Sequence, residues 1–416
     1  MYSLKHLIRT LGLTLVLAAM TACGGGGGES TPVVVQPVSS QPTQSNVLPL
    51  AVDSGPVGNG VNRLFASVTV CQPGNATLCQ TIDHILVDTG SAGLRLLSSA
   101  LTPALRLPTS SGAAGFPLLN CVQFIDNTYG WGPVALGDLV IGGKTASSVP
   151  IQVIADPAYK ALDSVCSSAG TATEINNTDT LGANGVLGIG LFKEDCGTAC
   201  ATNPANGYYF TCTSSGCTAT VGTTASTRQQ VQNPVPLFAA DNNGFLIDLP
   251  AVGASGADIL SGSLIFGVGT KSNNQLGEGK VLTTNSSGYI STLLLGRTLS
   301  NSFIDSGSNG LYFDNSTLAS CSVQSGAWGY YCPATSTAFS AILTGTNAVS
   351  SPVTFSVSNA LTLFNNPTLS VLPTLAGPIG DRRTFDWGLP FFYGRRVFFG
   401  IEGLTSTGGT GPFYAF

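Results

Sequence analysis

Charged residues and histidine are scarce in this chain of 416 residues. Asp and Glu together number 21, Lys and Arg number 16, and there are only two histidines. With a net charge of −5 and no basic cluster, the chain lacks the electrostatic footprint of a nucleic-acid-binding protein. Two histidines cannot build a histidine-rich metal site, and His6 lies in an N-terminal targeting segment. We therefore expect no metal site and no nucleic-acid partner.

The remaining histidine is a poor candidate for nucleophilic catalysis. A Ser-His-Asp or Cys-His site would have to use His84. On an extended strand His84 and Asp88 share a face but lie about 13 Å apart, at about 3.3 Å per residue. We interpret His84 as an ordinary residue near the start of a strand. No glycine-rich phosphate loop stands between a strand and a helix, so no nucleotide or other cofactor is expected.

Long apolar runs are missing outside the N-terminus, and the one found there indicates a targeting segment. Residues 1–23 predict a signal peptide, because Lys5 and Arg9 precede an apolar stretch at 11–20 that is short for a membrane span. Small residues before Cys23 and glycines after it resemble a bacterial lipoprotein signal. The resemblance implies lipidation of Cys23 and membrane anchoring in the bacterial cell envelope, facing the periplasm or the cell surface. The outer membrane is favoured because Gly24 follows the cysteine. The alternative is a secretory signal with an incidental cysteine.

The rest of the chain has the composition of a β-rich exported protein. Residues 24–60 hold no Lys or Arg and are rich in Gly, Ser, Pro and Gln, which predicts a disordered tether. From residue 61 onward, short apolar runs alternate with Gly, Asn, Ser and Pro. The chain also holds 52 glycines and 23 prolines, and its length suits two lobes. We predict an all-β fold with minor helices.

The cysteines indicate disulfides in an oxidising compartment. With Cys23 set aside, ten of the 11 cysteines remain, an even number for an exported chain. Spacing alone does not fix their connectivity, and it follows no zinc-binding pattern. Close spacing favours local pairs, and one longer bridge is available: Cys71/Cys79, Cys196/Cys200, Cys212/Cys217, Cys321/Cys332 and Cys121/Cys166.

An internal repeat stands out from this background. The sequences VDTGSAGLRL at 87–96 and IDSGSNGLYF at 304–313 align as an acid, Thr or Ser, Gly, Ser, any residue, Gly and Leu. Each half later carries a second apolar element with glycine, at 185–192 and 387–394. The simplest account is two homologous halves, each of which supplies one acid, Asp88 or Asp305.

Two such acids brought together predict acid–base hydrolysis. Carboxylates about 3 Å apart cannot both ionise cheaply, so one keeps its proton. The pair can then deprotonate a water and protonate a carbonyl oxygen without a covalent intermediate. The neighbouring residues suit this role, since glycines allow close backbone approach and hydroxyls can cross-link the loops or donate to the acids. These supporting residues are Thr89, Gly90, Ser91, Ser306, Gly307 and Ser308.

Together these motifs resemble the pepsin-like aspartic proteases over residues 61–416. VDTGS and IDSGS are similar to the two active-site signatures of that family, and residues 129–143 are similar to its flap hairpin and the strand after it. The resemblance implies that Tyr129, followed by Gly130, closes over the substrate. It also implies a bilobal fold with two homologous β-barrel-like lobes, 61–240 and 241–416, around a central cleft. Within that group the chain looks like a family of bacterial lipoproteins with this architecture. One departure is Arg95, which stands where the family usually has a tryptophan bonded to the flap tyrosine.

Three hypotheses follow. The leading one is an exported, lipid-anchored, monomeric aspartic endopeptidase that holds a peptide or protein substrate extended in the interlobe cleft. The alternative is a catalytically weak or inactive binding or scaffold lipoprotein with the same fold, suggested by Arg95 and by the cysteine-rich loop at 196–217. The third is an unrelated β protein, such as an adhesin, in which the two motifs match by chance and the two acids lie far apart.

Overall fold

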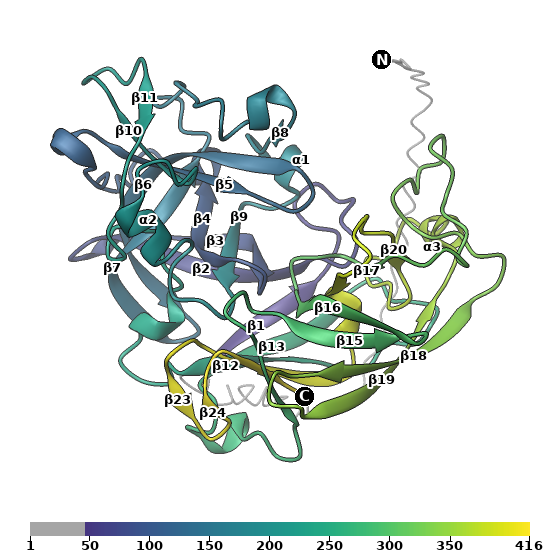
Figure 1. Ribbon diagram of the computed structural model, residues 1–416. Helices are drawn as coiled ribbons and strands as arrows, with labels where there is room; N and C mark the ends of the chain where they lie inside the picture. Colours follow the sequence, from purple (N-terminus) through teal and green to yellow (C-terminus); the bar gives the residue numbers. More distant parts are fainter. Residues whose placement is uncertain (1–45) are drawn as a thin grey trace, which may run out of the picture. The chain divides into compact units, whose positions relative to one another are not determined.

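The computed structural model describes residues 46–416, which belong to one compact unit (Figure 1). The predicted signal peptide, the lipidation at Cys23 and the tether up to residue 45 lie outside the described residues. Among residues 46–416 the α-helices are short: α1 (Thr178–Leu181), α2 (Thr198–Thr202) and α3 (Ala360–Phe364). None of the helices in this range is long and apolar enough to cross a membrane. Strands form the rest of the framework, so the predicted all-β class with minor helices is confirmed.

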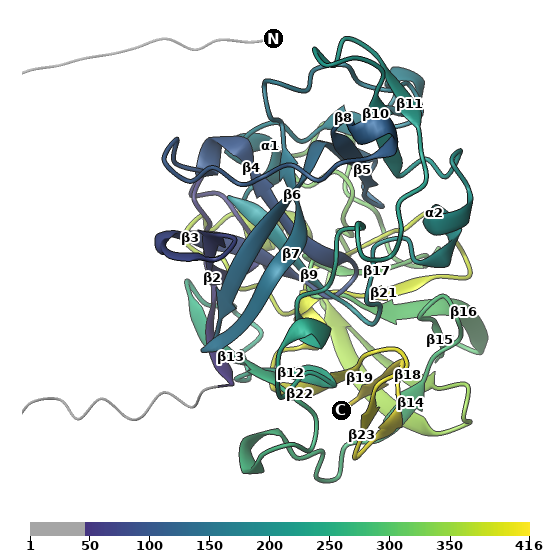
Figure 2. The ribbon, with the colours of Figure 1, turned by 90° about the vertical axis from the view of Figure 1, so that its left-hand side faces the viewer.

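A sheet of sixteen strands runs through both halves of the chain, which we define as residues 46–240 and 241–416. Figure 2 shows β2, β6 and β7 side by side within it. In order of pairing its strands are β11 (Thr220–Gly222), β10 (Tyr209–Cys212), β5 (Leu118–Gln123), β6 (Thr128–Ile141), β7 (Lys144–Ile154), β4 (Ala92–Leu97), β9 (Gly185–Ile189), β3 (Asn75–Asp88), β2 (Leu64–Gln72), β1 (Val47–Val52), β13 (Leu260–Phe266), β12 (Gly244–Leu249), β22 (Arg395–Gly400), β25 (Phe413–Ala415) and β14 (Val281–Thr283). The sixteenth strand, β8 (Thr173–Glu174), pairs with β6.

A second sheet belongs to the C-terminal half alone. Its seven strands, in order, are β19 (Ser350–Val357), β18 (Thr337–Thr344), β15 (Ile290–Leu294), β16 (Arg297–Ile304), β21 (Phe385–Trp387), β17 (Leu311–Phe313) and β20 (Ala376–Gly377). A small hairpin joins β23 (Thr405–Ser406) to β24 (Gly409–Thr410). Single 3-10 turns lie at Ser98–Ala100, Ala113–Gly115, Ser168–Gly170, Val235–Leu237, Ser272–Asn274 and Leu389–Phe391.

Strand β1 corrects the predicted tether. The prediction of disorder to residue 60 is wrong for this part, because β1 pairs with β13 over its whole length and with β2 at its end. Leu48, Leu50 and Val52 alternate along it and are at most 5% exposed, which is the period-two burial of a sheet strand. β1 therefore joins strands of the N-terminal half to strands of the C-terminal half. The lobe boundary at 240/241 stays a prediction.

The main hydrophobic core also draws on both halves. Val68 and Leu187 of the N-terminal half belong to the same buried cluster as Phe245 and Phe399 of the C-terminal half. The rings of Phe245 and Phe399 stack with centroids 4.8 Å apart, on the paired strands β12 and β22. This shared core keeps the ends of β3 and β16, where the two acids lie, in a fixed relation.

Five disulfides cross-link the described residues: the four local pairs that spacing favoured and the longer bridge that was available. Cys71 and Cys79 face each other in the register of β2 and β3. The bridge from Cys121 to Cys166 closes the longest loop, with a sequence separation of 45. Tertiary pairing thus supplied the connectivity that the sequence left open.

Candidate active site

Each half builds the same arrangement of strands around its acid. In the N-terminal half, β3 leads into Asp88 and pairs in parallel with β9, while β4 returns antiparallel to β9. In the C-terminal half, β16 ends one residue before Asp305 and pairs in parallel with β21, while β17 returns antiparallel to β21. The sequence repeat is therefore a structural repeat of strand, acid-bearing loop and strand, with a third strand between them.

In the first loop, Asp88 accepts hydrogen bonds from residues of its own turn. The backbone N–H of Gly90 donates to Oδ1 of Asp88 over 2.8 Å. The hydroxyl of Ser91 donates to Oδ2 of the same carboxyl group. Both carboxyl oxygens are thus held by local donors, as the motif predicted.

The second loop repeats these contacts. The backbone N–H of Gly307 donates to Oδ1 of Asp305 over 2.8 Å, and the hydroxyl of Ser308 donates to Oδ2 over 2.9 Å. Asp305 is 8% exposed and Asp88 is 6% exposed, so both carboxyl groups are largely withdrawn from water. Local donors of this kind offset part of the desolvation of a buried acid.

Reciprocal hydrogen bonds tie the two loops together. The hydroxyl of Thr89 donates to the carbonyl oxygen of Ile304 over 3.2 Å and accepts from the N–H of Ser306 over 2.9 Å. The hydroxyl of Ser306 donates to the carbonyl oxygen of Val87 over 2.7 Å and accepts from the N–H of Thr89 over 3.2 Å. Each loop thus satisfies backbone groups of the other, and this fixes the distance between the acids.

The two glycines allow the loops to approach closely. A Cβ atom on Gly90 would lie 2.8 Å from Cγ of Asp305, and one on Gly307 would lie 2.6 Å from Oδ1 of Asp88. Real Cβ atoms do not approach that closely, so each loop needs glycine beside the acid of the other. The two carboxyl groups therefore lie side by side, each against the glycine of the other loop. This proximity removes the basis for treating the two motifs as chance matches.

The environment assigns the proton of the pair to Asp305. Burial raises the pKa of Asp305 well above its ordinary value, and the negative charges of Asp88 and then Asp386 raise it further. The N–H of Gly307 acts in the opposite direction, but less strongly. Like charges in one desolvated site cannot both ionise cheaply, and the raised pKa of Asp305 favours this acid as the one that keeps a proton.

A third carboxyl group, which sequence analysis missed, lies beside this pair. Asp386 of β21 is 1% exposed, and burial followed by the charge of Asp88 raises its pKa to about 8. The hydroxyl of Ser308 hydrogen-bonds to this carboxyl group and lowers its pKa somewhat. The signal was present in the sequence, because Asp386 stands between Phe385 and Trp387 just as Asp88 follows an apolar run. The apolar element predicted at 387–394 starts at Trp387, one residue after Asp386.

The predicted flap residues lie in the β5–β6 hairpin, at the start of β6. Tyr129 is 5% exposed and belongs to a hydrophobic cluster with Leu119, Trp131 and Phe210. Burial, followed by the charge of Glu174, raises the pKa of Tyr129. Because its ring packs among apolar neighbours of the hairpin sheet, its closing over a substrate stays a prediction. Gly130 lies beside it, and its carbonyl oxygen accepts from Nε2 of Gln152 over 3.1 Å.

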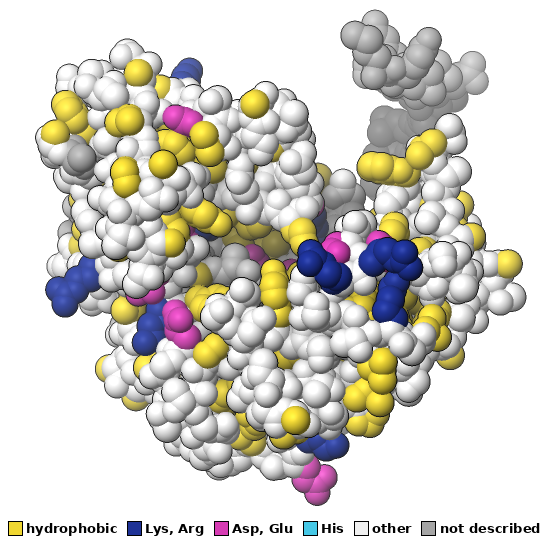
Figure 3. Space-filling view, viewed as in Figure 1, with side chains coloured by type: hydrophobic (Ala, Val, Ile, Leu, Met, Phe, Trp, Pro, Cys, Tyr) yellow, Lys and Arg dark blue, Asp and Glu magenta, His cyan; other side chains and the backbone are white. Residues whose placement is uncertain are grey.

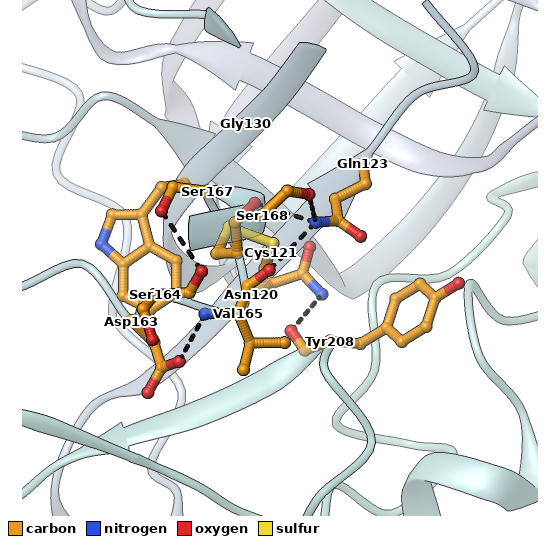
Figure 4. The surroundings of a disulfide bond; sticks show 12 residues. Asn120, Cys121, Gln123, Gly130, Asp163, Ser164, Val165, Ser167, Ser168 and Tyr208 are labelled. Atoms are coloured by element: carbon orange, nitrogen blue, oxygen red, sulfur yellow. Dashed lines mark hydrogen bonds between the residues drawn. A yellow bond between two sulfur atoms is a disulfide. The ribbon is translucent and has the colours of Figure 1, made fainter. Parts of the chain in front are cut away.

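This hairpin is anchored along both edges. β10 pairs with β5, and β8 pairs with β6 at Thr128 and Tyr129. Figure 4 shows the disulfide from Cys121 to the segment around Val165, and the amide of Gln123 directed at the same segment. Nε2 of Gln123 donates to the carbonyl oxygens of Val165 over 3.1 Å and of Cys166 over 2.9 Å. The hairpin is therefore part of a wider sheet rather than a free arm.

Arg95 lies in a buried polar network in β4. Nη1 donates to Oδ1 of Asn120 and to Oε1 of Gln152, each over 2.6 Å, and Nη2 forms an ion pair with Asp195 at 3.1 Å. Tyr209 completes the network by donating its hydroxyl to Asp195 over 2.6 Å. Burial raises the pKa of Asp195, and Arg95 is the strongest of the groups that oppose the rise. Arg95 thus ties β4 to β5, β7 and the loop that holds Asp195.

One face of the molecule has a hollow that holds both acidic and apolar side chains (Figure 3). Figure 3 shows this hollow, on the face seen in Figure 1, between the upper strands of the N-terminal half and the lower strands of the C-terminal half. Within residues 46–416 no group of three or more His, Cys, Asp and Glu side chains is arranged to hold a metal ion. His84 instead contacts the carboxylates of Asp53 at 3.6 Å and Asp83 at 3.3 Å. The reactive groups described at the acid pair are carboxyl groups and hydroxyls.

The fold and the acid pair define a class: an all-β protein with two homologous halves, each of which supplies one acid. The chain belongs to the family described as "Protein of unknown function (DUF3443)", whose model matches residues 42–416. No curated protein matches the chain. Among solved structures, the chain is similar to the one titled "Crystal structure of aspartic proteinase from Irpex lacteus". That likeness has 14% identity and a TM-score of 0.46, and it covers 89% of this chain and 96% of that one. Membership of a bacterial lipoprotein family stays a prediction.

Proposed function

We propose that this protein is an aspartic endopeptidase that hydrolyses peptide bonds with a water held between Asp88 and Asp305. One observation carries the proposal: each acid-bearing loop places its glycine against the carboxyl group of the other loop, while local N–H and hydroxyl groups hold both acids. Such a pair with one shared proton is the arrangement for which aspartic proteases are the standard example. The internal repeat supports the proposal independently, because it supplies one acid from each half.

The assignment of the proton gives each acid a role. Asp88, ionised, accepts a proton from the water as the water oxygen attacks the carbonyl carbon of the substrate. Asp305 donates its proton to the carbonyl oxygen, and a neutral tetrahedral intermediate with two hydroxyl groups forms. Transfer of the proton on Asp88 to the amide nitrogen, with return of a hydroxyl proton to Asp305, then breaks the C–N bond and restores the starting protonation.

The rest of the proposal concerns the substrate and the location of the protein. A peptide or protein chain would bind extended in the hollow of Figure 3. Lipidation of Cys23 anchors a monomer to a membrane of the bacterial cell envelope, and residues 24–45 act as the tether. These parts of the proposal rest on the sequence signals at residues 1–45.

The test is cleavage of a denatured, fluorescently labelled protein between pH 3 and pH 8. Asp88→Asn and Asp305→Asn are each expected to lower kcat/KM by about 10²–10⁴-fold, because each removes one partner of the general acid–base pair. Glu278→Gln, at an exposed position, is the matched control and is expected to cleave like wild type. Equal cleavage by wild type and both active-site variants, or no cleavage by wild type at any pH, would remove the protease proposal.

A second candidate function is a binding or scaffold protein that uses the same fold. The anchored hairpin favours it, because the disulfide from Cys121 to Cys166 and the pairing of β8 with β6 restrain the element that a protease would open. Binding would then be stoichiometric and independent of the acid pair. A partner retained with unchanged affinity by the Asp88→Ala and Asp305→Ala double variant, together with no cleavage by wild type, would select this function.

A further inference from the structure

Asp386 is an acid for which the fold gives no counter-charge. It lies in β21 between the fully buried side chains of Phe385 and Trp387 and is itself 1% exposed. None of the ion pairs among residues 46–416 includes Asp386, and its Oδ1 has no hydrogen-bond partner. A buried carboxylate without a cation or a full set of donors is the costly form of the group, so this environment favours the protonated acid.

The internal repeat shows that the fold itself does not require an acid at this position. Asp386 faces Phe303, which lies two residues before Asp305 on β16. In the N-terminal half, Leu86 lies two residues before Asp88, and its partner on β9 is Val186. Val186 is 1% exposed, so the same place in the twin holds an apolar side chain at equal burial. The acid is therefore a feature added to one half.

Ser308 connects Asp386 to the acid pair. Its hydroxyl donates to Oδ2 of Asp305 over 2.9 Å, and the same hydroxyl lies near enough to the carboxyl group of Asp386 to lower its pKa. A serine hydroxyl has one hydrogen, so it cannot donate to both acids at once. While Asp386 carries a proton, its O–H donates to Oγ of Ser308 and Ser308 donates to Asp305. When Asp386 ionises, it competes for the hydrogen of Ser308 and places a second negative charge beside Asp305.

The titratable groups around Asp386 reinforce this behaviour. The negative charge of Asp88 raises the pKa of Asp386. The charge of Asp386 in turn raises the pKa of Asp305, of Tyr312 in β17 and of Tyr414 in β25. These neighbours are acids or phenols whose ionisation only adds negative charge. Burial raises the pKa of Asp386 to about 8, so the change falls at neutral to mildly alkaline pH.

We propose that Asp386 is a positioning residue that, through Ser308 and its own charge, opposes loss of the proton shared by Asp88 and Asp305 and so extends the active range of the pair toward alkaline pH. This inference rests on the proposed function, because it concerns the protonation state that the hydrolysis requires. It assigns no contact with the substrate to Asp386.

Two variants test this inference in the cleavage assay. Asp386→Asn keeps the size of the side chain and an N–H donor for Ser308 but cannot ionise, and Asp386→Val gives the C-terminal half the residue of its twin. With Asp386→Asn, cleavage at acidic pH is expected to stay at the wild-type level, while the alkaline limb of kcat/KM moves to lower pH by about one unit. Asp386→Val is expected to show the same shift with a lower rate at all pH values, because Ser308 loses its donor. An alkaline limb that stays in place in Asp386→Asn, with Glu278→Gln as control, would overturn the inference.

A second measurement does not depend on cleavage. The C=O stretch of protonated carboxyl groups, recorded by infrared spectroscopy of the whole protein at pH 7, is expected to weaken in Asp386→Asn and in Asp305→Asn relative to wild type. No loss of intensity in Asp386→Asn would show that Asp386 is ionised at pH 7 and would overturn the inference. A wild type that shows the Asp386 band but never cleaves would instead overturn the proposed function, so the two failures are distinguishable.

Discussion

The two halves of this protein have the same acid-bearing loop but place their buried charges on different strands. In the N-terminal half the charged residue is Arg95 on β4, opposite the apolar Val186 of β9. In the C-terminal half the charged residue is Asp386 on β21, opposite Tyr312 of β17. The loops are alike because both must hold one acid and bond to each other. The flanking strands need only be buried, so they were free to diverge.

The two buried charges also differ in how they are neutralised. Arg95 has an ion-pair partner in Asp195 and amide acceptors in Asn120 and Gln152. Asp386 has only the hydroxyl of Ser308 and one oxygen without a partner. Arg95 therefore links several strands of its half through its partners. Asp386 is instead an acid without an ion-pair partner in the neighbourhood of Asp305. The surroundings of Asp88 and Asp305 are therefore unequal. Under the proposed function, general acid–base catalysis requires such a difference between the two acids.

The largest expected effect concerns Asp386 and the pH dependence of stability. Its pKa is raised to about 8 in the folded protein, so between pH 4 and pH 8 the folded state binds more protons than the unfolded state. The contribution of Asp386 to the free energy of unfolding should then fall as pH rises through this window. Asp386→Asn removes this loss, so the curves for variant and wild type should diverge by on the order of 5 kcal/mol from pH 4 to pH 8. Urea unfolding at each pH measures the divergence.

The control for that series is Glu278→Gln, whose stability should run parallel to wild type because the side chain is exposed. Parallel curves for Asp386→Asn and wild type would mean that Asp386 ionises as easily in the folded state as in the unfolded chain. Asp386 and its N-terminal counterpart Val186 would then differ in the shape of the side chain alone, and not in its protonation.

The next effect compares Arg95 with Tyr312, its counterpart in the repeat. Arg95→Met leaves Asp195 as a buried charge without its ion-pair partner, which is expected to lower the free energy of unfolding by about 3–5 kcal/mol. Tyr312→Phe removes only the hydroxyl that donates to Oδ1 of Asn309 over 2.5 Å, and is expected to cost about 1 kcal/mol. Thermal and urea unfolding at pH 7 would give both values. Equal losses would show that the charge of Arg95 is not what holds its half together.

The smallest effect concerns the contacts that the halves share. Thr89→Val and Ser306→Ala each remove a hydroxyl that bonds to one donor and one acceptor of the other loop. Each is expected to lower the free energy of unfolding by about 1–3 kcal/mol, and by nearly equal amounts, because the bonds are reciprocal. Urea unfolding of the single variants and of the double variant measures both the losses and their coupling. If only one of the two variants lost stability, the two loops would not contribute equally to the contact between the halves.

Local patterns in the sequence predicted much of this structure. Apolar runs bounded by Gly, Pro and Asn indicated the β framework, and close cysteine spacing indicated four of the five disulfides. The repeat around Asp88 and Asp305 indicated the acid pair and its supporting residues. In each case the signal lies within a few residues or in the comparison of two short segments.

The features that were missed depend on distant partners. β1 was read as tether, because six residues with Pro and Ala look like linker until β13 offers them an edge to pair with. The pairing of β8 and β10 with the edges of the Tyr129 hairpin also has no local signal in the sequence, while the closing of Tyr129 over a substrate stays a prediction. The position of Asp386 has no local signal, because only the register places it between β16 and β17, the strands on either side of the loop of Asp305.

By itself the sequence determined that the chain has two related halves and that each carries an acid in a loop of small and hydroxyl-bearing residues. Only the tertiary structure decided that the two acids lie together and that burial, Asp88 and Asp386 raise the pKa of Asp305. The physical reason is that a pKa depends on burial and on charges within a few ångströms. In this protein those charges come from strands hundreds of residues apart, brought together by a core that both halves share.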